Sequence, residues 1–291
     1  DSDALFAYLR SLPPVAQPDR PADVRFPFNT QAALAVWRAL FFRAGSFTPD
    51  PQRDAAWNRG AYLVQGLAHC TACHGERNVF GATTESLAFS GGLLPMQNWY
   101  APSLARSDEA GVADWPLDEV VALLKTGSAA RGSALGPMAE VVFRSTQHAS
   151  DDDLRAIATF LQALPKAEPP RVRKRSVEAA EMRRGAQVYE ARCADCHGKA
   201  GEGAAAGPHA RAVPPLAGNR AVAMHEPANV IRVVISGGFP PATTGNPRPF
   251  GMPPLGQDLN DAEIAAVVTF IRNSWGHAAG AVRPHEVARL R

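Results

Sequence analysis

Apolar residues recur at helical spacing in two segments of the chain, and each segment follows a polar residue able to cap a helix. The apolar positions are Leu154, Ile157, Leu161 and Leu164 in the first segment, and Ile264, Val267, Val268, Ile271 and Trp275 in the second. Ser150 with Asp153, and Asn260 with Glu263, match the pattern of a capped helix start. The sequence therefore predicts two amphipathic helices, the first of which ends before Pro165.

A third copy of this pattern opens the chain. Its residues are Leu5, Tyr8, Leu9, Leu12 and Pro13, which match Ile157, Phe160, Leu161, Leu164 and Pro165 at a constant offset of 152 positions. Two interpretations remain open for this segment: the closing helix of a further domain, or a plain amphipathic helix. The first residues show no basic and no apolar region of a signal peptide, and no apolar run reaches 18 residues. We therefore expect neither a signal peptide nor a membrane-spanning helix.

Composition and charge narrow the class of protein. Hydrophobic residues make up 46% and charged residues 20%, with 24 glycines and 25 prolines, which indicates a globular protein with short helices and stiff loops. The net charge of +2 provides no basic field, so no nucleic-acid partner is expected. The most apolar stretch, 32–42, is a candidate contact with a partner subunit or a membrane surface, with ordinary packing as the alternative.

All four cysteines fall into two copies of one motif. Cys70, Cys73 and His74 form the first C-x-x-C-H, and Cys193, Cys196 and His197 form the second. This spacing is typical of covalent haem attachment: two thiols three residues apart can form thioethers to the two vinyl groups of one porphyrin, and the adjacent imidazole can ligate the iron. The sequence predicts two covalently bound c-type haems.

Three other interpretations of the cysteines compete with haem attachment. A four-thiolate zinc site would combine both pairs but would leave the repeated histidine as a coincidence. A thioredoxin-like redox pair needs a βαβ setting, of which the sequence gives no sign. A disulfide within each pair would close almost no loop and would stabilise little.

The surroundings of the two motifs repeat as well. Each motif follows a short helical segment that contains a glycine, Gly60 or Gly185, and each is followed by a Gly/Pro-rich stretch and one of the two amphipathic helices. This order resembles the class I cytochrome c fold, in which the first and last helices cross at a glycine. We expect an all-α chain with two such domains in tandem, preceded by a helical fragment resembling the end of a further cytochrome c domain.

Two methionines are candidates for the sixth iron ligand. Met138 lies in Gly136-Pro137-Met138 and Met252 in Gly251-Met252-Pro253, each among chain breakers ahead of a closing helix, so we expect both to be presented from loops. They follow His74 and His197 by 64 and 55 positions. The alternatives are Met96 or His148 for the first iron, and Met224 or His225 for the second. Candidate partners of the haem propionates are Arg77, Asn78, Trp99, Tyr100, Arg131, Arg220 and Arg248.

Several longer runs extend the resemblance to a particular family. They are Trp57–Val64, Gly91-Gly92, Trp99–Pro102, Gly136–Val142, Pro214–Ala217 and Met252-Pro253. With the two motifs, they resemble the multihaem cytochrome c subunits of bacterial periplasmic dehydrogenases. Those subunits usually carry three haem domains, whereas this sequence has two C-x-x-C-H motifs and Gly75-Glu76 where the family often has Thr-Pro.

The resemblance implies domain bounds and a function. The bounds are 1–45 for the remnant and connector, 46–166 for the first cytochrome domain, 167–180 for a linker, 181–278 for the second domain and 279–291 for a C-terminal tail. The implied function is electron transfer from a molybdenum, flavin or quinoprotein dehydrogenase subunit to a quinone, oxidase or soluble acceptor. The implied location is the periplasm, where a peripheral contact with the membrane is an option. No catalytic residue is expected in this chain. A dihaem peroxidase or thiosulfate-oxidising enzyme, or a stand-alone soluble electron shuttle, remains the alternative.

Overall fold

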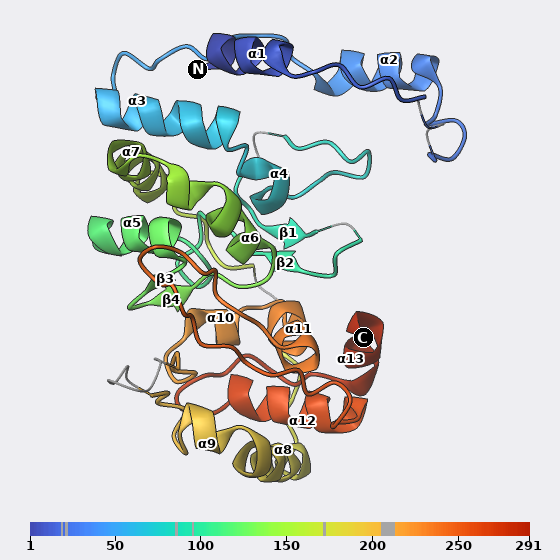
Figure 1. Cartoon of the computed structure of the whole chain (residues 1–291). Coiled ribbons are helices and arrows are strands. Elements are labelled where there is room, and N and C mark those ends of the chain that lie inside the picture. The colour runs from blue at the N-terminus through green and yellow to red at the C-terminus, as the bar shows by residue number, and fades with distance from the viewer. Residues whose placement is uncertain (19, 21–22, 85–86, 95, 171–172, 205–212) are drawn as a thin grey trace. The chain divides into compact units, whose positions relative to one another are not determined.

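The chain folds into helices with very little sheet (Figure 1). The structure is a computed structural model that describes residues 1–291 except 19, 21–22, 85–86, 95, 171–172 and 205–212. Its described strands are two residues long and form two antiparallel pairs, β1 with β2 and β3 with β4. The expected helical class is confirmed, and the two small ladders are an addition. No described helix is long and apolar enough to cross a bilayer.

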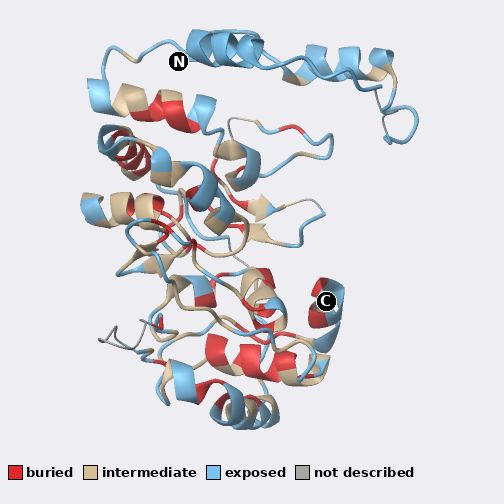
Figure 2. Ribbon diagram, in the orientation of Figure 1, coloured by how far each residue is buried: buried red, intermediate tan, exposed pale blue. Residues whose placement is uncertain are grey.

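The described chain divides into two compact units, residues 1–46 and 47–291. The first unit contains α1 (Ser2–Ser11) and α2 (Gln31–Phe41), and neither helix buries a residue (Figure 2). Helix α1 matches the amphipathic segment expected at the start of the chain. Because Phe6, Phe26 and Leu40 are more than half exposed, the first unit leaves its apolar side chains uncovered.

The second unit comprises two halves, residues 47–166 and 167–291. The first half contains α3 (Ala55–Tyr62), a π-helical turn η1 (Leu63–Leu67), α4 (Thr71–His74), β1 (Gly92–Leu93), β2 (Tyr100–Ala101), α5 (Leu117–Thr126), β3 (Ser128–Ala129), β4 (Gly132–Ser133), α6 (Pro137–Arg144), the 3₁₀ turn η3 (Thr146–His148) and α7 (Asp151–Gln162). The second half contains α8 (Ala179–Arg192), α9 (Ala194–His197), α10 (Arg220–Ala223), α11 (Ala228–Ser236), α12 (Asp261–Arg272) and α13 (Pro284–Leu290). The linker between them includes residues 171–172, which lie outside the described residues.

Each half has its own hydrophobic core, and the two predicted amphipathic helices are central to them. Leu154 of α7 is fully buried in the first core, and Ile264 of α12 in the second. Figure 2 shows buried stretches along both helices. Both helices start at the predicted caps: the Ser150 hydroxyl accepts from the Asp153 amide, and Asn260 forms a capping box with Glu263. The period of apolar residues therefore predicted these two helices correctly.

Glycine permits the closest helix crossing in each half, as the sequence predicts. A Cβ added at Gly60 of α3 would lie 2.0 Å from the Ala156 carbonyl oxygen of α7. At Gly185 of α8 it would lie 2.2 Å from the Ala266 oxygen of α12. No side chain fits at such distances, so only glycine allows these backbones to approach. The helix pairs α3–α7 and α8–α12 lie side by side in Figure 1.

The C-terminal part differs from the expectation in two details. Helix α12 ends at Arg272, and Trp275 lies beyond it with a φ of 52°, its ring centroid 5.1 Å from that of Tyr189. Residues 279–291, expected to form a tail, include α13, whose Val287 and Leu290 are buried in the second core.

The two halves meet through polar and aromatic contacts. The Arg220 guanidinium lies over the Trp115 ring at 5.4 Å and donates to the Gly111 carbonyl at 3.1 Å. The Thr243 hydroxyl donates to the Thr126 carbonyl at 3.2 Å. A further contact joins α11 to strand β2: the side chain of Asn229 forms two hydrogen bonds with the backbone of Tyr100.

Candidate functional site

The first C-x-x-C-H motif follows the helix that crosses α7. Cys70 lies ten positions after Gly60, whereas Cys193 lies eight positions after Gly185. The two additional residues of the first copy coincide with the π-helical turn η1 between α3 and α4. In the second half, α8 runs without interruption to Arg192, and Cys193 follows directly. Both copies nevertheless end in a four-residue helix whose last residue is the histidine, His74 or His197.

His74 has a fixed orientation. Its Nδ1 lies 2.7 Å from the carbonyl oxygen of Pro102, which follows strand β2, so Nδ1 donates its proton there and Nε2 carries the lone pair. Burial lowers the pKa of His74, and the Pro102 carbonyl opposes that effect only in part. The imidazole is therefore neutral at pH 7, the form that binds a metal ion.

His197 lies in similar surroundings but lacks a firm partner. Its Nδ1 is buried without a hydrogen bond of normal geometry, although the nearby Pro214 carbonyl acts to raise the pKa of the ring. Burial is the larger effect and lowers the pKa of His197. Sequence reasoning missed the acceptor groups Pro102 and Pro214, because a backbone carbonyl can belong to any residue type.

All four cysteines are unpaired, so neither motif forms a disulfide in this structure. Burial raises the pKa of Cys70 and of Cys193 to about 11. Within the described residues, no three His, Cys, Asp or Glu side chains lie close enough to share a metal ion. The structure therefore does not bring the two cysteine pairs together, which a four-thiolate zinc site would require.

Met138 lies on a helix, and the expectation of a loop is wrong for this residue. It is the second residue of α6, which begins at Pro137 after Gly136 with a φ of 55°. Proline at the first helical position is favourable because its missing N–H needs no partner there. Met138 is half-buried and packs against the first core.

Met252 lies outside regular helix, as expected. Its backbone pairs with that of Gly238 through two hydrogen bonds, with N···O distances of 2.9 and 3.1 Å. The side chain is half-buried and packs against the second core. The short bridge and the following prolines hold this residue in a fixed position.

The alternative ligands differ in exposure. Met96 is fully exposed at 100%, and His148 and His225 are exposed as well. Met224 is 6% exposed, and its carbonyl accepts a hydrogen bond from Arg272. Only half-buried or buried sulfur atoms can face an enclosed metal, which favours Met138 over Met96.

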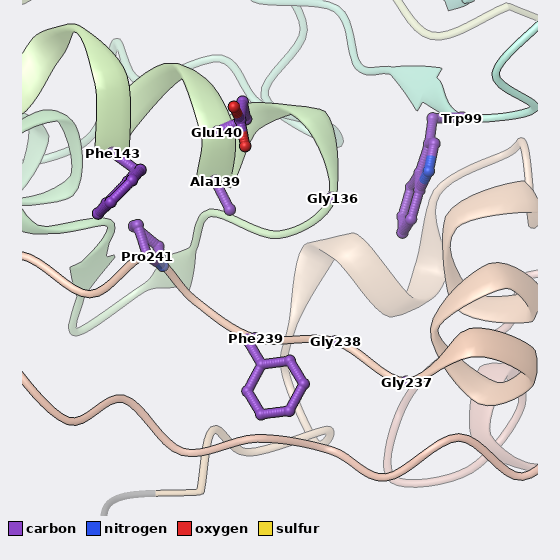
Figure 3. Close-up of a pocket in the computed structure, with 9 residues that line it drawn as sticks. All are labelled: Trp99, Gly136, Ala139, Glu140, Phe143, Gly237, Gly238, Phe239 and Pro241. Carbon is purple, nitrogen blue, oxygen red and sulfur yellow. The ribbon is translucent and has the colours of Figure 1, made fainter.

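An open, mostly apolar pocket of about 310 Å³ lies between the segments that carry the two methionines (Figure 3). Trp99, Gly136 and α6 line one side, and Gly237, Gly238 and Phe239 line the other. The Leu135 side chain lies 3.7 Å from the position of a Cβ on Gly238. Leu135, three positions before Met138, therefore lies close to Gly238, the residue that pairs with Met252.

Several candidate propionate partners are already engaged within the protein. Arg220 contacts the first half, Arg131 forms ion pairs with Asp114 and Glu119, and Arg77 donates to the Ala72 carbonyl at 3.0 Å. Arg248 is exposed. Trp99 lies in the pocket of Figure 3, and Tyr100 contacts the second half. Within the described residues, these contacts do not single out one group as a propionate partner.

The residues of both motifs fit a covalently bound haem. Each copy offers one unpaired thiol immediately before a four-residue helix, a second within that helix, and a neutral, half-buried imidazole as its last residue. The buried Nδ1 of His74 has the carbonyl partner that orients a ligating histidine. Each core also contains a half-buried methionine, Met138 or Met252.

Comparisons with known proteins agree with this interpretation of the residues. The cytochrome c family matches residues 182–275, which include the second motif and the α8–α12 pair. The chain is 37% identical to the cytochrome c subunit of an alcohol dehydrogenase (quinone) from Gluconacetobacter polyoxogenes, over 100% of this chain and 65% of that protein. It is 35% identical to the gluconate 2-dehydrogenase cytochrome c subunit of Pantoea cypripedii, over 100% of this chain and 69% of that protein. It is 32% identical to the fructose dehydrogenase cytochrome subunit of Gluconobacter japonicus, over 100% of this chain and 64% of that protein.

The chain thus belongs to the family of cytochrome c subunits of bacterial dehydrogenases. It spans about 65% of the length of the alcohol dehydrogenase subunit. The resemblance expected from the motifs is confirmed.

Proposed function

We propose that this chain is an electron-transfer subunit that carries two covalently bound c-type haems. The observation that carries the proposal is the repetition of one constellation in both halves: a glycine helix crossing, a C-x-x-C-H turn with unpaired thiols, and a half-buried methionine. Family membership supports it independently. In this proposal the halves are two class I cytochrome c domains in tandem, 46–166 and 181–278.

The proposed haem ligands follow from the placement of the side chains. Cys70 and Cys73 would bind the vinyl groups of the first porphyrin, and Cys193 and Cys196 those of the second. His74 and His197 would be the proximal ligands, with the Pro102 carbonyl orienting the first imidazole. Met138 and Met252 would be the sixth ligands.

The haem supplies one-electron chemistry, and the protein supplies ligation, burial and geometry. The chain's own residues orient the imidazoles, and the buried faces of α7 and α12 exclude water from the two cores. The contacts between the halves, such as Arg220 on Trp115, hold the two sites at one separation. We therefore propose no catalytic residue in this chain.

The relatives suggest the partner. Their names place them in dehydrogenases that act on alcohols, gluconate and fructose, so we propose a catalytic dehydrogenase subunit as the electron donor. A quinone, an oxidase or a soluble carrier would accept the electrons. Because haem c is attached after export, we propose that the chain works in the periplasm.

The ligands are tested on the full chain expressed with haem-attachment machinery. A pyridine haemochrome assay is expected to give two haems per chain, and the ferric spectrum is expected to show the methionine-to-iron charge-transfer band. Met138→Ala and Met252→Ala should each remove about half of this band, whereas Met96→Ala, a change at a fully exposed side chain, should leave it intact.

Three results would contradict the proposal. One haem per chain, or zinc in place of iron, would exclude the two-haem arrangement. A high-spin haem in the unmodified protein would favour a dihaem enzyme such as a peroxidase, because an open iron position is what that chemistry needs. A band that persists in Met138→Ala would assign the sixth ligand elsewhere.

A further inference from the structure

The segment that orients His74 is attached to the second half of the protein. Pro102, whose carbonyl faces His74 Nδ1, follows strand β2 (Tyr100–Ala101). β2 pairs with β1 along one edge only, and the N–H and C=O of Tyr100 point away from that pair toward α11. An unpaired strand edge needs other partners for its backbone groups.

Asn229, near the start of α11, provides both partners. Its Oδ1 accepts from the Tyr100 amide at 2.8 Å, and its Nδ2 donates to the Tyr100 carbonyl at 2.7 Å. The side-chain amide thus replaces a neighbouring strand at one residue, 129 positions away in the sequence. Such a two-point contact fixes both peptide planes of Tyr100 and, two residues on, restricts where the Pro102 carbonyl lies.

We propose that Asn229 is a positioning residue for His74, through Tyr100 and Pro102; the inference rests on the proposed role of His74 as an iron ligand. When a carbonyl accepts the hydrogen bond from Nδ1–H, the imidazole becomes a stronger electron donor to a metal bound at Nε2. When that hydrogen bond is weakened, the imidazole becomes a weaker electron donor. A stronger donor stabilises the ferric state. Loss of the Asn229 contact therefore raises the reduction potential of the first haem.

The effect is specific to the first site. The second imidazole has no equivalent support, because His197 Nδ1 lacks a hydrogen bond of normal geometry. Its neighbouring segment is held within its own half, by the bridge between Ala204 and Val213. The second half of the protein thus influences the reduction potential of the first haem through Asn229. Within the described residues, the second haem has no corresponding contact from the first half.

Other contacts also hold β2, which limits the size of the effect. The Tyr100 hydroxyl donates to Glu109 at 3.0 Å, and the Ser103 amide donates to the same carboxylate at 2.6 Å. The strand therefore shifts rather than unfolds when Asn229 is replaced.

The test is a spectroelectrochemical titration of the full two-haem chain. In Asn229→Leu, which keeps the size and removes both hydrogen bonds, the ferrous-to-ferric ratio of the first haem at a fixed potential should rise about threefold, or about 30 mV for one electron. The first haem is assigned as the one whose spectrum changes in Met138→Ala.

A matched control separates positioning from general destabilisation. Asn260→Ala removes the cap of α12, whose hydrogen bonds are with Ala262 and Glu263 rather than with Tyr100 or Asn229, and should lower the urea midpoint without moving either potential. The inference is overturned if Asn229→Leu leaves the first potential unchanged, or moves both potentials equally. If the unmodified chain carries no haem or no methionine band, the proposed function fails instead, so the two failures are distinguishable.

Discussion

The helix crossing at Gly60 gives a sharp test of the fold. In Gly60→Ala the new methyl group would lie 2.0 Å from the Ala156 carbonyl oxygen and 2.8 Å from Phe160 Cβ. The first neighbour is backbone and cannot rotate away, so α3 and α7 must separate by about 1.4 Å to restore an ordinary 3.4 Å contact. A gap of about 0.5–1 Å already forfeits about a quarter to a half of the attraction between facing atoms, so this larger separation forfeits more.

The expected cost can be set against the gain in helix propensity. Overpacking of this kind costs about 1–3 kcal/mol and occasionally more, and alanine regains up to about 1 kcal/mol over glycine within a helix. Because the clash is with backbone at 2.0 Å, we take the upper end of the overpacking cost and expect Gly60→Ala to lower the free energy of unfolding by about 2 kcal/mol. Gly66→Ala is the matched control, because a Cβ at Gly66 meets nothing within 4 Å.

The assay is urea unfolding of the haem-loaded chain, followed by far-ultraviolet circular dichroism. Gly60→Ala should lower the midpoint, and Gly66→Ala should leave it unchanged or raise it slightly. Equal midpoints for the two variants would show that α3 and α7 do not cross at Gly60.

Two further predictions concern polar groups on the closing helices. The Arg59 guanidinium holds the pKa of Asp153 below its usual range. The Asp153 carboxylate therefore stabilises the fold at pH values above its ordinary pKa of about 4. This contribution is lost as the pH falls through the lower pKa of the folded state. Asp153→Asn should therefore lower the free energy of unfolding at pH 7, by less than about 1 kcal/mol because both side chains are partly exposed. The difference from the unmodified chain in urea titrations should vanish on acidification, and a difference that persists at pH 2 would contradict this. Asn260→Ala should cost about 1 kcal/mol through loss of the α12 cap, whereas Gln257→Ala, a change at an exposed side chain, should cost nothing measurable in the same titration.

The sequence predicted the parts of the fold that are encoded locally. The apolar period of α7 and α12 and their caps are each visible within a short window, so each could be inferred without a structure. The roles of Gly60 and Gly185 were implied by the resemblance to the class I cytochrome c fold. The π-helical turn η1 is different: it follows from two additional residues before Cys70, and the sequence does not say how a chain absorbs them.

The contacts between the halves could not be predicted. The Tyr100–Asn229 contact joins residues 129 positions apart, and nothing in the period of either segment marks it. Pro102 acts through a backbone carbonyl that every residue type possesses. Gly136 and Pro137 favour a loop at Met138 when the sequence is considered alone, yet proline at this position starts a helix as readily as it ends one.

The buried Arg272 has a consequence for where the second half can be cut. Its guanidinium donates to the carbonyls of Val222 and Met224 at 3.1 and 2.8 Å, and Val282 donates to Thr269 on the same helix at 2.9 Å. The stretch matched by the cytochrome c family stops at residue 275, before this last anchoring segment. A polypeptide truncated there would expose the apolar residues against which α13 packs, and it would loosen the segment that surrounds the buried Arg272. The end of the sequence match is therefore not the end of an independently folding unit.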